Sequence, residues 1–283
     1  MKTGLVLEGG GMRCLFTAGI LDVMMEEGIS FDGMVGVSAG SAFGCNYKSR
    51  QPGRALRYNK RFARCWRYTS WRSWLLTGNL VNARMAYHVV PTRYDVFDAE
   101  AFAANPMAFW LVCTDVDSGK AVYHQLEKVD HEALEWIRAS ASLPVVSRIV
   151  HLCGRKLLDG GIADSIPLAF FQRQGYVRNV VILSQPRSYR KRQKGYIHIV
   201  DFWLRRHPAI RKAMDERPDM YNAQLDYVAQ QEQQGNTLVL APDAPLNIAD
   251  VSKSPADMQR VYDLGRAYGR AHIDEIRAFV EQR

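Results

Sequence analysis

Long hydrophobic runs are missing from this sequence, and its cysteines are few and widely spaced. No uninterrupted apolar stretch approaches the roughly 20 residues of a membrane span. The apolar run behind Lys2 is broken by Glu8 and three glycines, too early for the core of a signal peptide. The five cysteines show no C-x-x-C spacing, which argues against a disulfide framework and a structural metal site. We therefore expect a soluble, cytoplasmic protein.

Acidic residues are absent between Gly33 and Tyr94, whereas basic residues are frequent there. The basic residues of this stretch are Lys48, Arg50, Arg54, Arg57, Lys60, Arg61, Arg64, Arg67, Arg72, Arg84 and Arg93. The whole chain has 283 residues, 37 of them basic and 29 acidic, which gives a net charge of +8. Such an excess favours contact with an anionic partner.

Two strand-turn-helix units follow one another at the N-terminus. A short apolar run, Thr3–Leu7, precedes three glycines and then a helical apolar spacing over Cys14–Glu27. Met34–Val37 repeats the strand, Ser38 lies in the turn, and a second helix begins near Ala42. Successive units of this kind predict a parallel sheet with helices on its faces.

The remaining chain continues this pattern and then becomes mostly helical. We expect strands at Phe109–Thr114, Ala121–Gln125, Ile149–Cys153, Lys156–Leu158, Val180–Leu183 and Thr237–Leu240, and helices from Asp130 to about Ser140, from Pro167 to Gln174 and from about Pro255 to Phe279. A basic loop, Arg187–Lys194, lies between the last two strands.

Residues 51–94 interrupt the pattern with a cationic and aromatic segment. A helix is predicted over Arg54–Arg67, with Arg57, Arg61, Arg64 and Arg67 on one face. An aromatic stretch from Trp66 to Trp74 follows. We interpret residues 51–94 as an excursion that lies over the sheet.

The segment Gly36-Val37-Ser38-Ala39-Gly40 fits the nucleophile-elbow pattern G-x-S-x-G. A serine in a strained strand-to-helix turn needs neighbours without side chains, and Gly36 and Gly40 meet that demand. The helix that follows directs backbone N–H groups toward developing negative charge. A chance match to so short a pattern is the alternative.

Glu8-Gly9-Gly10-Gly11-Met12-Arg13 presents several unencumbered N–H groups between a strand and a helix. Such a loop suits an oxyanion hole or a phosphate cradle. Cys14 stands where a dinucleotide fingerprint needs its third glycine, and no G-K-[ST] follows as in a Walker loop.

Asp159-Gly160-Gly161 ends a predicted strand and can hold a carboxylate in an open turn. A serine nucleophile needs a base, but none of the seven histidines lies in a small-residue loop late in the chain. If Ser38 is catalytic, a carboxylate is therefore the expected base. In isolation the Asp-Gly turn fits an ordinary surface turn equally well.

Together, the Gly9–Arg13 loop, the elbow at Ser38 and the Asp159 turn resemble the patatin-like phospholipase family. Arg138-Ala139-Ser140-Ala141-Ser142-Leu143-Pro144 is similar to the A-S-x-x-x-P segment that precedes the aspartate in that family. The resemblance covers roughly the first 185 residues.

The resemblance implies lipid acyl-ester hydrolysis by a dyad in which Ser38 attacks and Asp159 accepts its proton. Backbone amides of the loop would bind the oxyanion, and no metal or organic cofactor would be needed. The implied oxyanion-hole residues are Gly9, Gly10, Gly11 and Met12, and the supporting residues are Arg13, Gly36, Gly40, Gly160 and Gly161. Arg13 would brace the loop or meet an anionic head group.

The implied fold is a three-layer α/β domain with a mainly parallel sheet and helices on both faces. Residues 1–185 would form the catalytic core with its excursion at about 51–94, and residues 186–283 a mostly helical part packed on the same domain. The substrate within the phospholipase, lysophospholipase and esterase classes, and the oligomeric state, stay open.

The cationic, aromatic segment leaves other functions open. In one interpretation its basic face touches anionic lipid head groups at the inner membrane face, while Trp71, Trp74 and Leu75 enter the acyl boundary. In the other, the segment is a solvated helix whose aromatic residues cap the core. A non-catalytic lipid- or nucleic-acid-binding protein and an acyltransferase are the alternatives. No recognised nucleic-acid motif is present, so no specific nucleic acid is expected.

Overall fold

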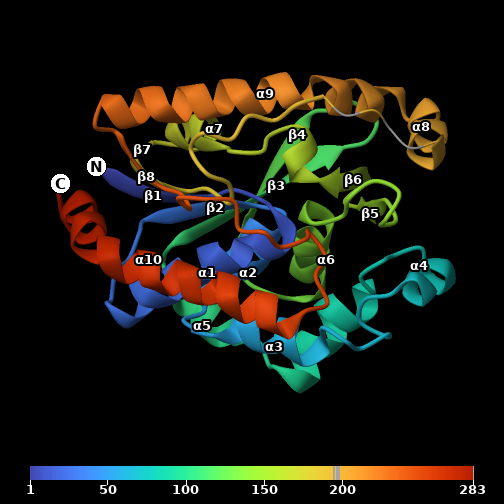
Figure 1. Ribbon diagram of the computed structural model, residues 1–283, viewed down its shortest axis with the longest axis horizontal. Coiled ribbons are helices and arrows are strands. Elements are labelled where there is room, and N and C mark those ends of the chain that lie inside the picture. Colours follow the sequence, from blue (N-terminus) through green and yellow to red (C-terminus); the bar gives the residue numbers. More distant parts are fainter. Residues whose placement is uncertain (194, 196–197, 283) are drawn as a thin grey trace.

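The computed structural model describes residues 1–193, 195 and 198–282 and is built around a sheet of eight strands (Figure 1). Lys194, at the end of the predicted basic loop, lies outside these residues. Five strands run parallel, in the order β3-β2-β1-β7-β8. Their bounds are β1 Lys2–Leu7, β2 Gly33–Val37, β3 Ala108–Asp115, β7 Tyr176–Ile182 and β8 Thr237–Leu240.

Three antiparallel strands extend the sheet beyond β3. The strand β4 (Ala121–Leu126) pairs with β3, and so does β6 (Arg155–Asp159), which in turn pairs with β5 (Val150–Leu152). The sheet is thus mixed but mostly parallel, as predicted. Because β6 joins the carboxyl-terminal end of β3, Asp159 is carried to the end of the parallel sheet.

Helices cover both faces of the sheet and make a three-layer molecule (Figure 1). One face carries α1 (Cys14–Glu26), α2 (Ala39–Lys48), α6 (His131–Ser140) and α10 (Pro255–Glu281), and the other carries α7 (Leu168–Arg173) and α9 (Pro208–Gln233). Successive side chains of a strand point to opposite faces of the sheet, so the hydrophobic core has one part on each face. In β1, Leu5 and Leu7 belong to the first side and Val6 to the second. The predicted fold class is confirmed.

The segment from residue 51 to 94 differs from its prediction. Its first helix, α3, spans Arg54–Phe62 and does not reach Arg67, so the four-arginine face is wrong. The chain turns back after Phe62 because Phe62, Tyr68 and Val90 bury one another in a small apolar cluster. The helix α3 packs on α1, α2 and α10, so it covers helices where a position over the sheet was predicted.

Short elements complete the described chain, in which no helix is both long and apolar enough to cross a bilayer. They are α4 (Trp71–Thr77), a π-helical segment η2 (Met85–Tyr94), α5 (Ala99–Ala104), α8 (His198–Arg205), and the 3₁₀ turns η1 (Gly11–Arg13) and η3 (Gly160–Ile162). The turn η1 lies within the Glu8–Arg13 segment singled out in the sequence, and η3 includes Gly160 and Gly161 of the Asp159 turn.

Candidate active site

Ser38 occupies a strained turn between β2 and α2, with φ 54° and ψ −125°. A positive φ is uncommon for a residue other than glycine and is stored where the surroundings enforce it. A Cβ on Gly36 would lie 2.7 Å from the Ser41 backbone, and one on Gly40 would lie 2.7 Å from the Glu8 carbonyl oxygen. Both glycines are therefore needed to seat the start of α2 against the ends of β1 and β2.

Ser140 stabilises the turn through a hydrogen bond with the Ser38 backbone. The Ser38 N–H donates to Ser140 Oγ at 3.0 Å, and Ser140 Oγ donates to the Val112 carbonyl at 2.7 Å. Ser140 is the last residue of α6 and is fully buried. It lies in the Arg138–Pro144 segment noted in the sequence, but its contact with the Ser38 amide was not predicted.

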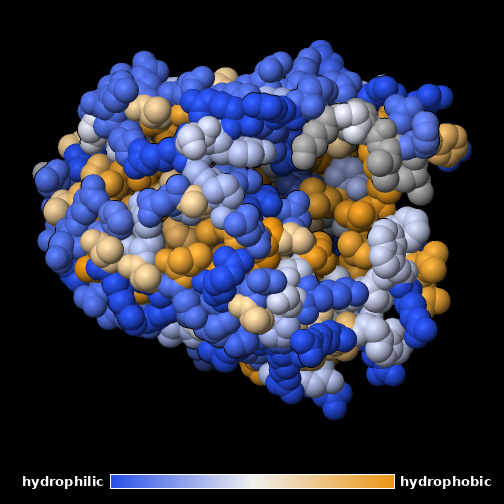
Figure 2. All heavy atoms as spheres, in the orientation of Figure 1, coloured by the Kyte–Doolittle hydropathy of each residue, from blue (hydrophilic) through white to orange (hydrophobic). Residues whose placement is uncertain are grey.

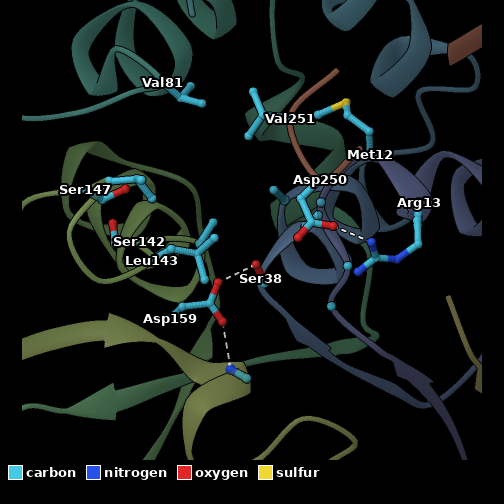
Figure 3. Close-up of a pocket in the computed structure, with 18 of the residues that line it drawn as sticks. Met12, Arg13, Ser38, Val81, Ser142, Leu143, Ser147, Asp159, Asp250 and Val251 are labelled. Atoms are coloured by element: carbon cyan, nitrogen blue, oxygen red, sulfur yellow. Dashed lines mark hydrogen bonds and ion pairs between the residues drawn. The ribbon is translucent and has the colours of Figure 1, made fainter. Parts of the chain in front are cut away.

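The carboxylate of Asp159 lies directly beside the Ser38 hydroxyl (Figure 3). Ser38 Oγ donates to Asp159 Oδ2 at 2.5 Å, and the Gly161 N–H donates to Asp159 Oδ1 at 2.8 Å. A Cβ on Gly160 would lie 2.1 Å from the Val112 carbonyl oxygen, so Gly160 lets the Asp159 turn close onto β3. The structure thus brings together two side chains that are 121 positions apart.

Burial sets the electrostatics of this pair. Asp159 is only 2% exposed, and loss of hydration raises the pKa of its carboxyl above the ordinary value. The Ser38 hydrogen bond and the positive charge of Arg217 act in the opposite direction and stabilise the ionised form. The result is a carboxylate that is a stronger proton acceptor than an exposed aspartate.

The glycine loop follows β1 and lies against Ser38. A Cβ on Gly9 would be 2.9 Å from Ser38 Cβ, which shows how closely the loop approaches. Within the described chain, the N–H groups of Gly10 and Gly11 donate to no acceptor. The Met12 N–H, in contrast, donates to the Asp250 carbonyl at 3.0 Å. The prediction that Met12 supplies an oxyanion-hole amide therefore does not fit, because its N–H is already engaged.

Residues from the C-terminal third brace this loop. Arg13 forms an ion pair with Asp250, so its bracing role is the one the geometry supports. Glu8 is buried beneath the loop and accepts hydrogen bonds from the Ser184 N–H at 2.6 Å and the Tyr221 hydroxyl at 2.7 Å. Sequence reasoning missed Tyr221 and Asp250, since no local pattern marks them, and it gave no role to Glu8 at the start of the glycine segment.

Ser38 and Asp159 lie on the floor of a cavity of about 570 Å³. Apolar side chains form much of its wall, among them Phe43, Leu80, Val81, Leu143 and Val146. Figure 2 shows this face of the molecule hollowed, with apolar residues gathered in the hollow between the α9 side and the α4 side. The cavity can hold an apolar chain next to the Ser38 hydroxyl.

The fold and the Ser38 turn define a protein of nucleophile-elbow architecture. A family model described as patatin-like phospholipase matches residues 5–171, more than half of the chain. The chain therefore belongs to the patatin-like phospholipase family. A second model, a domain of unknown function (DUF6363), matches residues 207–281.

Two relatives of this chain are longer than the chain itself. The uncharacterized protein YjjU of Escherichia coli (strain K12) is 34% identical over 203 residues, 65% of this chain and 52% of that protein. Lysophospholipase nte1 of Aspergillus niger is 24% identical over 296 aligned positions, 98% of this chain and 18% of that protein. The chain thus spans about half of the first relative and under a fifth of the second. The crystal structure of VipD from Legionella pneumophila aligns with a TM-score of 0.47 and 12% identity, over 97% of this chain and 67% of that chain.

Proposed function

We propose that this protein is a serine acyl hydrolase that cleaves carboxylic ester bonds of lipids. The observation that carries the proposal is the 2.5 Å hydrogen bond from Ser38 Oγ to Asp159 Oδ2, on the floor of a cavity with apolar walls. The lysophospholipase name of the fungal relatives supports a single-chain lipid ester as substrate.

In the proposed mechanism Ser38 Oγ attacks the ester carbonyl carbon while its proton passes to Asp159 Oδ2. The oxygen of the tetrahedral intermediate accepts hydrogen bonds from the free N–H groups of Gly10 and Gly11. Asp159 then protonates the leaving alcohol. A water that loses its proton to Asp159 attacks the acyl-enzyme, releases the fatty acid and restores the Ser38 hydroxyl.

Asp159 is the base in this proposal because of what surrounds Ser38. No histidine is found among the described residues that line the cavity. The Asp159 carboxylate is ordered by the Gly161 N–H and touches the Ser38 hydroxyl directly. Both requirements of an activated serine, a base within reach and a group that orients it, are then met by one loop.

Hydrolysis of p-nitrophenyl acyl esters tests the proposal. We expect Ser38→Ala and Asp159→Asn each to lower kcat/KM by about 10³-fold or more, as for other members of a nucleophile pair. Exposed Ser30→Ala and Asp117→Asn serve as matched controls and should leave turnover unchanged. A fluorophosphonate probe should label Ser38, located by mass spectrometry. Equal turnover in wild type and both site variants would reject the mechanism.

The alternatives are outcomes of the same experiment. Binding of lipid without ester hydrolysis, unchanged in Ser38→Ala, would indicate a non-catalytic lipid-binding protein. Salt-dependent nucleic-acid binding without hydrolysis would indicate a nucleic-acid module. Transfer of the acyl group to an added alcohol in preference to water would indicate an acyltransferase.

We also propose that the protein contacts an anionic membrane surface peripherally through α4. The side chains of Trp71, Leu75 and Leu76 are 68%, 75% and 75% exposed, which is unusual for large apolar residues grouped on one short helix. Exposed Arg64, Arg67 and Arg72 lie in or just before α4 and match anionic head groups. Cytoplasmic localisation stays a prediction.

A further inference from the structure

Two basic side chains line the cavity without forming an ion pair to any described residue, although the charge of Arg217 acts on nearby Asp159. Arg217, from α9, and Lys191, from the segment after β7, both line the cavity. Within the described chain neither forms an ion pair, and the Arg217 Nε is buried with no hydrogen-bond partner. Two cations that line one cavity and form no ion pair can bind the anionic group of a ligand.

Arg217 lies next to the Asp159 turn. Its Nη2 is 3.2 Å from the position that a Cβ on Gly161 would occupy, and Gly161 is the residue whose N–H holds Asp159. The guanidinium is thus close to the reacting groups, and Arg217 lines the cavity they share. The carboxylates nearby have partners of their own: Asp159 has Ser38 and Gly161, and Asp250 has Arg13.

Asn222 fixes the backbone of Lys191, and Tyr221 lies beside its ammonium group. The Lys191 N–H donates to Asn222 Oδ1 at 2.8 Å, and Asn222 Nδ2 donates back to the Lys191 carbonyl at 3.0 Å. Its ammonium lies 4.8 Å from the centre of the Tyr221 ring. Burial and the nearby charge of Arg217 lower the pKa of Lys191 to about 8, while the carboxyl groups of Glu8 and Asp250 act in the opposite direction without forming an ion pair with it.

The wall with the two cations and the wall with the apolar residues come from different elements. Arg217 and Lys191 come from the side of the sheet that α9 covers, whereas Leu80 and Val81 follow α4 on the other side (Figure 1). Ser38 lines the same cavity. A substrate with an apolar chain at one end and an anion at the other end of its ester would match both walls.

We propose that Arg217 and Lys191 form a subsite for the phosphate of the substrate's head group. The inference rests on the proposed function and narrows it to lysophospholipids whose phosphate lies next to the scissile ester. The acyl chain occupies the apolar wall, the ester carbonyl faces Ser38, and the phosphate oxygens accept hydrogen bonds from Arg217 and Lys191. The C-terminal part of the chain thereby determines which lipids are cleaved.

A matched pair of substrates tests the subsite. A monoacylglycerol and its 3-phosphate with the same acyl chain, below their critical micelle concentrations, differ only in the phosphate. We expect wild type to show a kcat/KM at least about tenfold higher for the phosphorylated lipid, since hydrogen bonds to charged groups carry this order of selectivity. Lys191→Met and Arg217→Gln should each reduce that ratio about tenfold through KM, and Arg217→Lys should restore part of it.

Lys212→Met is the matched control, because Lys212 is also on α9 but is exposed and paired with Glu216. It should leave the ratio unchanged. A wild-type ratio near one, or a ratio in Lys191→Met equal to that of wild type, would overturn the subsite.

Calorimetry with the Ser38→Ala protein separates this proposal from the hydrolytic one. Glycerol 3-phosphate should bind to Ser38→Ala and lose at least about tenfold in affinity when Lys191→Met is added. This result is independent of turnover, so it decides the subsite even if wild type hydrolyses neither lipid. Inorganic phosphate that binds as tightly as glycerol 3-phosphate, with no preference for the phosphorylated lipid, would assign the cations to a free anion and overturn the head-group proposal.

Discussion

At the scale of single residues, the site depends on strain and burial that other residues maintain. Ser38 keeps its positive φ because Gly36 and Gly40 let the chain close around it. The hydroxyl oxygen of Ser140 also accepts a hydrogen bond from the Ser38 N–H. Asp159 keeps a raised pKa because it is buried, while Arg217 limits that rise. Packing of the surrounding sheet and helices offsets the free-energy cost of the strained Ser38 backbone and of the buried Asp159 carboxylate.

The raised pKa of Asp159 predicts the acid limb of the pH profile. Because the proposed base must be ionised, kcat/KM for an uncharged ester should fall as pH drops through a pKa above the ordinary aspartate range. Removing the stabilising charge with Arg217→Gln should move this limb to still higher pH. Profiles measured below pH 7, with Arg190→Gln as the exposed control, check both shifts. A limb that stays in place or moves to lower pH in Arg217→Gln would contradict the assignment of Asp159.

At the scale of elements, α4 connects the cavity wall to the molecular surface. The Trp74 indole N–H donates to the Val145 carbonyl at 2.9 Å, which fixes α4 to the segment that leads into the Asp159 hairpin. The opposite side of the helix exposes Leu75 and Leu76. A surface bound there would contact the helix that directly precedes Leu80 and Val81 of the cavity wall.

Vesicle binding tests this role of α4. Leu75→Ser with Leu76→Ser should reduce partition onto phosphatidylglycerol vesicles by roughly tenfold or more, because each leucine contributes about 1.5–3 kcal/mol when buried. Added salt should weaken the remaining, electrostatic part. Leu264→Ser, which changes a leucine that is 46% exposed on α10, is the matched control for sedimentation assays. If the double variant Leu75→Ser/Leu76→Ser binds the vesicles as well as Leu264→Ser does, membrane contact through α4 is refuted.

At the scale of the whole molecule, the N-terminal and C-terminal parts share one interior. The helices α1 and α10 touch through their backbones, since a Cβ on Gly19 would lie 2.3 Å from the Tyr262 carbonyl oxygen and one on Gly265 would lie 2.0 Å from that of Phe16. The Tyr262 hydroxyl donates to Asp22 in the same interface. The last helix is thus packed directly on the helix that follows the glycine loop.

Gly265→Ala measures the importance of this interface. Alanine is the better helix former by about 1 kcal/mol, but its methyl group would collide with backbone that cannot move aside cheaply. We expect the free energy of unfolding in urea to decrease by about 1–3 kcal/mol. Leu264→Ala, at the neighbouring exposed position, should change it by less than about 0.5 kcal/mol. If both variants unfold alike, α1 and α10 are not tightly coupled.

The sequence by itself determined the local order of this protein. Short-range patterns of apolar and small residues predict two units. One consists of the strand, glycine loop and helix at residues 2–26, and the other of the strand, Ser38 turn and helix at residues 33–48. The end of α3 was mispredicted because Phe62, Tyr68 and Val90 bury one another, and this contact overrides the helical spacing that extends to Arg67.

Only the tertiary structure decided what completes the site. Tyr221, Arg217 and Asp250 reach the site from distant parts of the chain, and nothing in their own neighbourhoods in the sequence distinguishes them. Ser140 lies in a segment that the sequence did single out, but its hydrogen bond with the Ser38 amide depends on how α6 packs. The physical reason is that local patterns report backbone geometry and amphipathic faces. Which buried donor meets which acceptor depends on how the layers pack, and packing joins residues that are far apart in the chain.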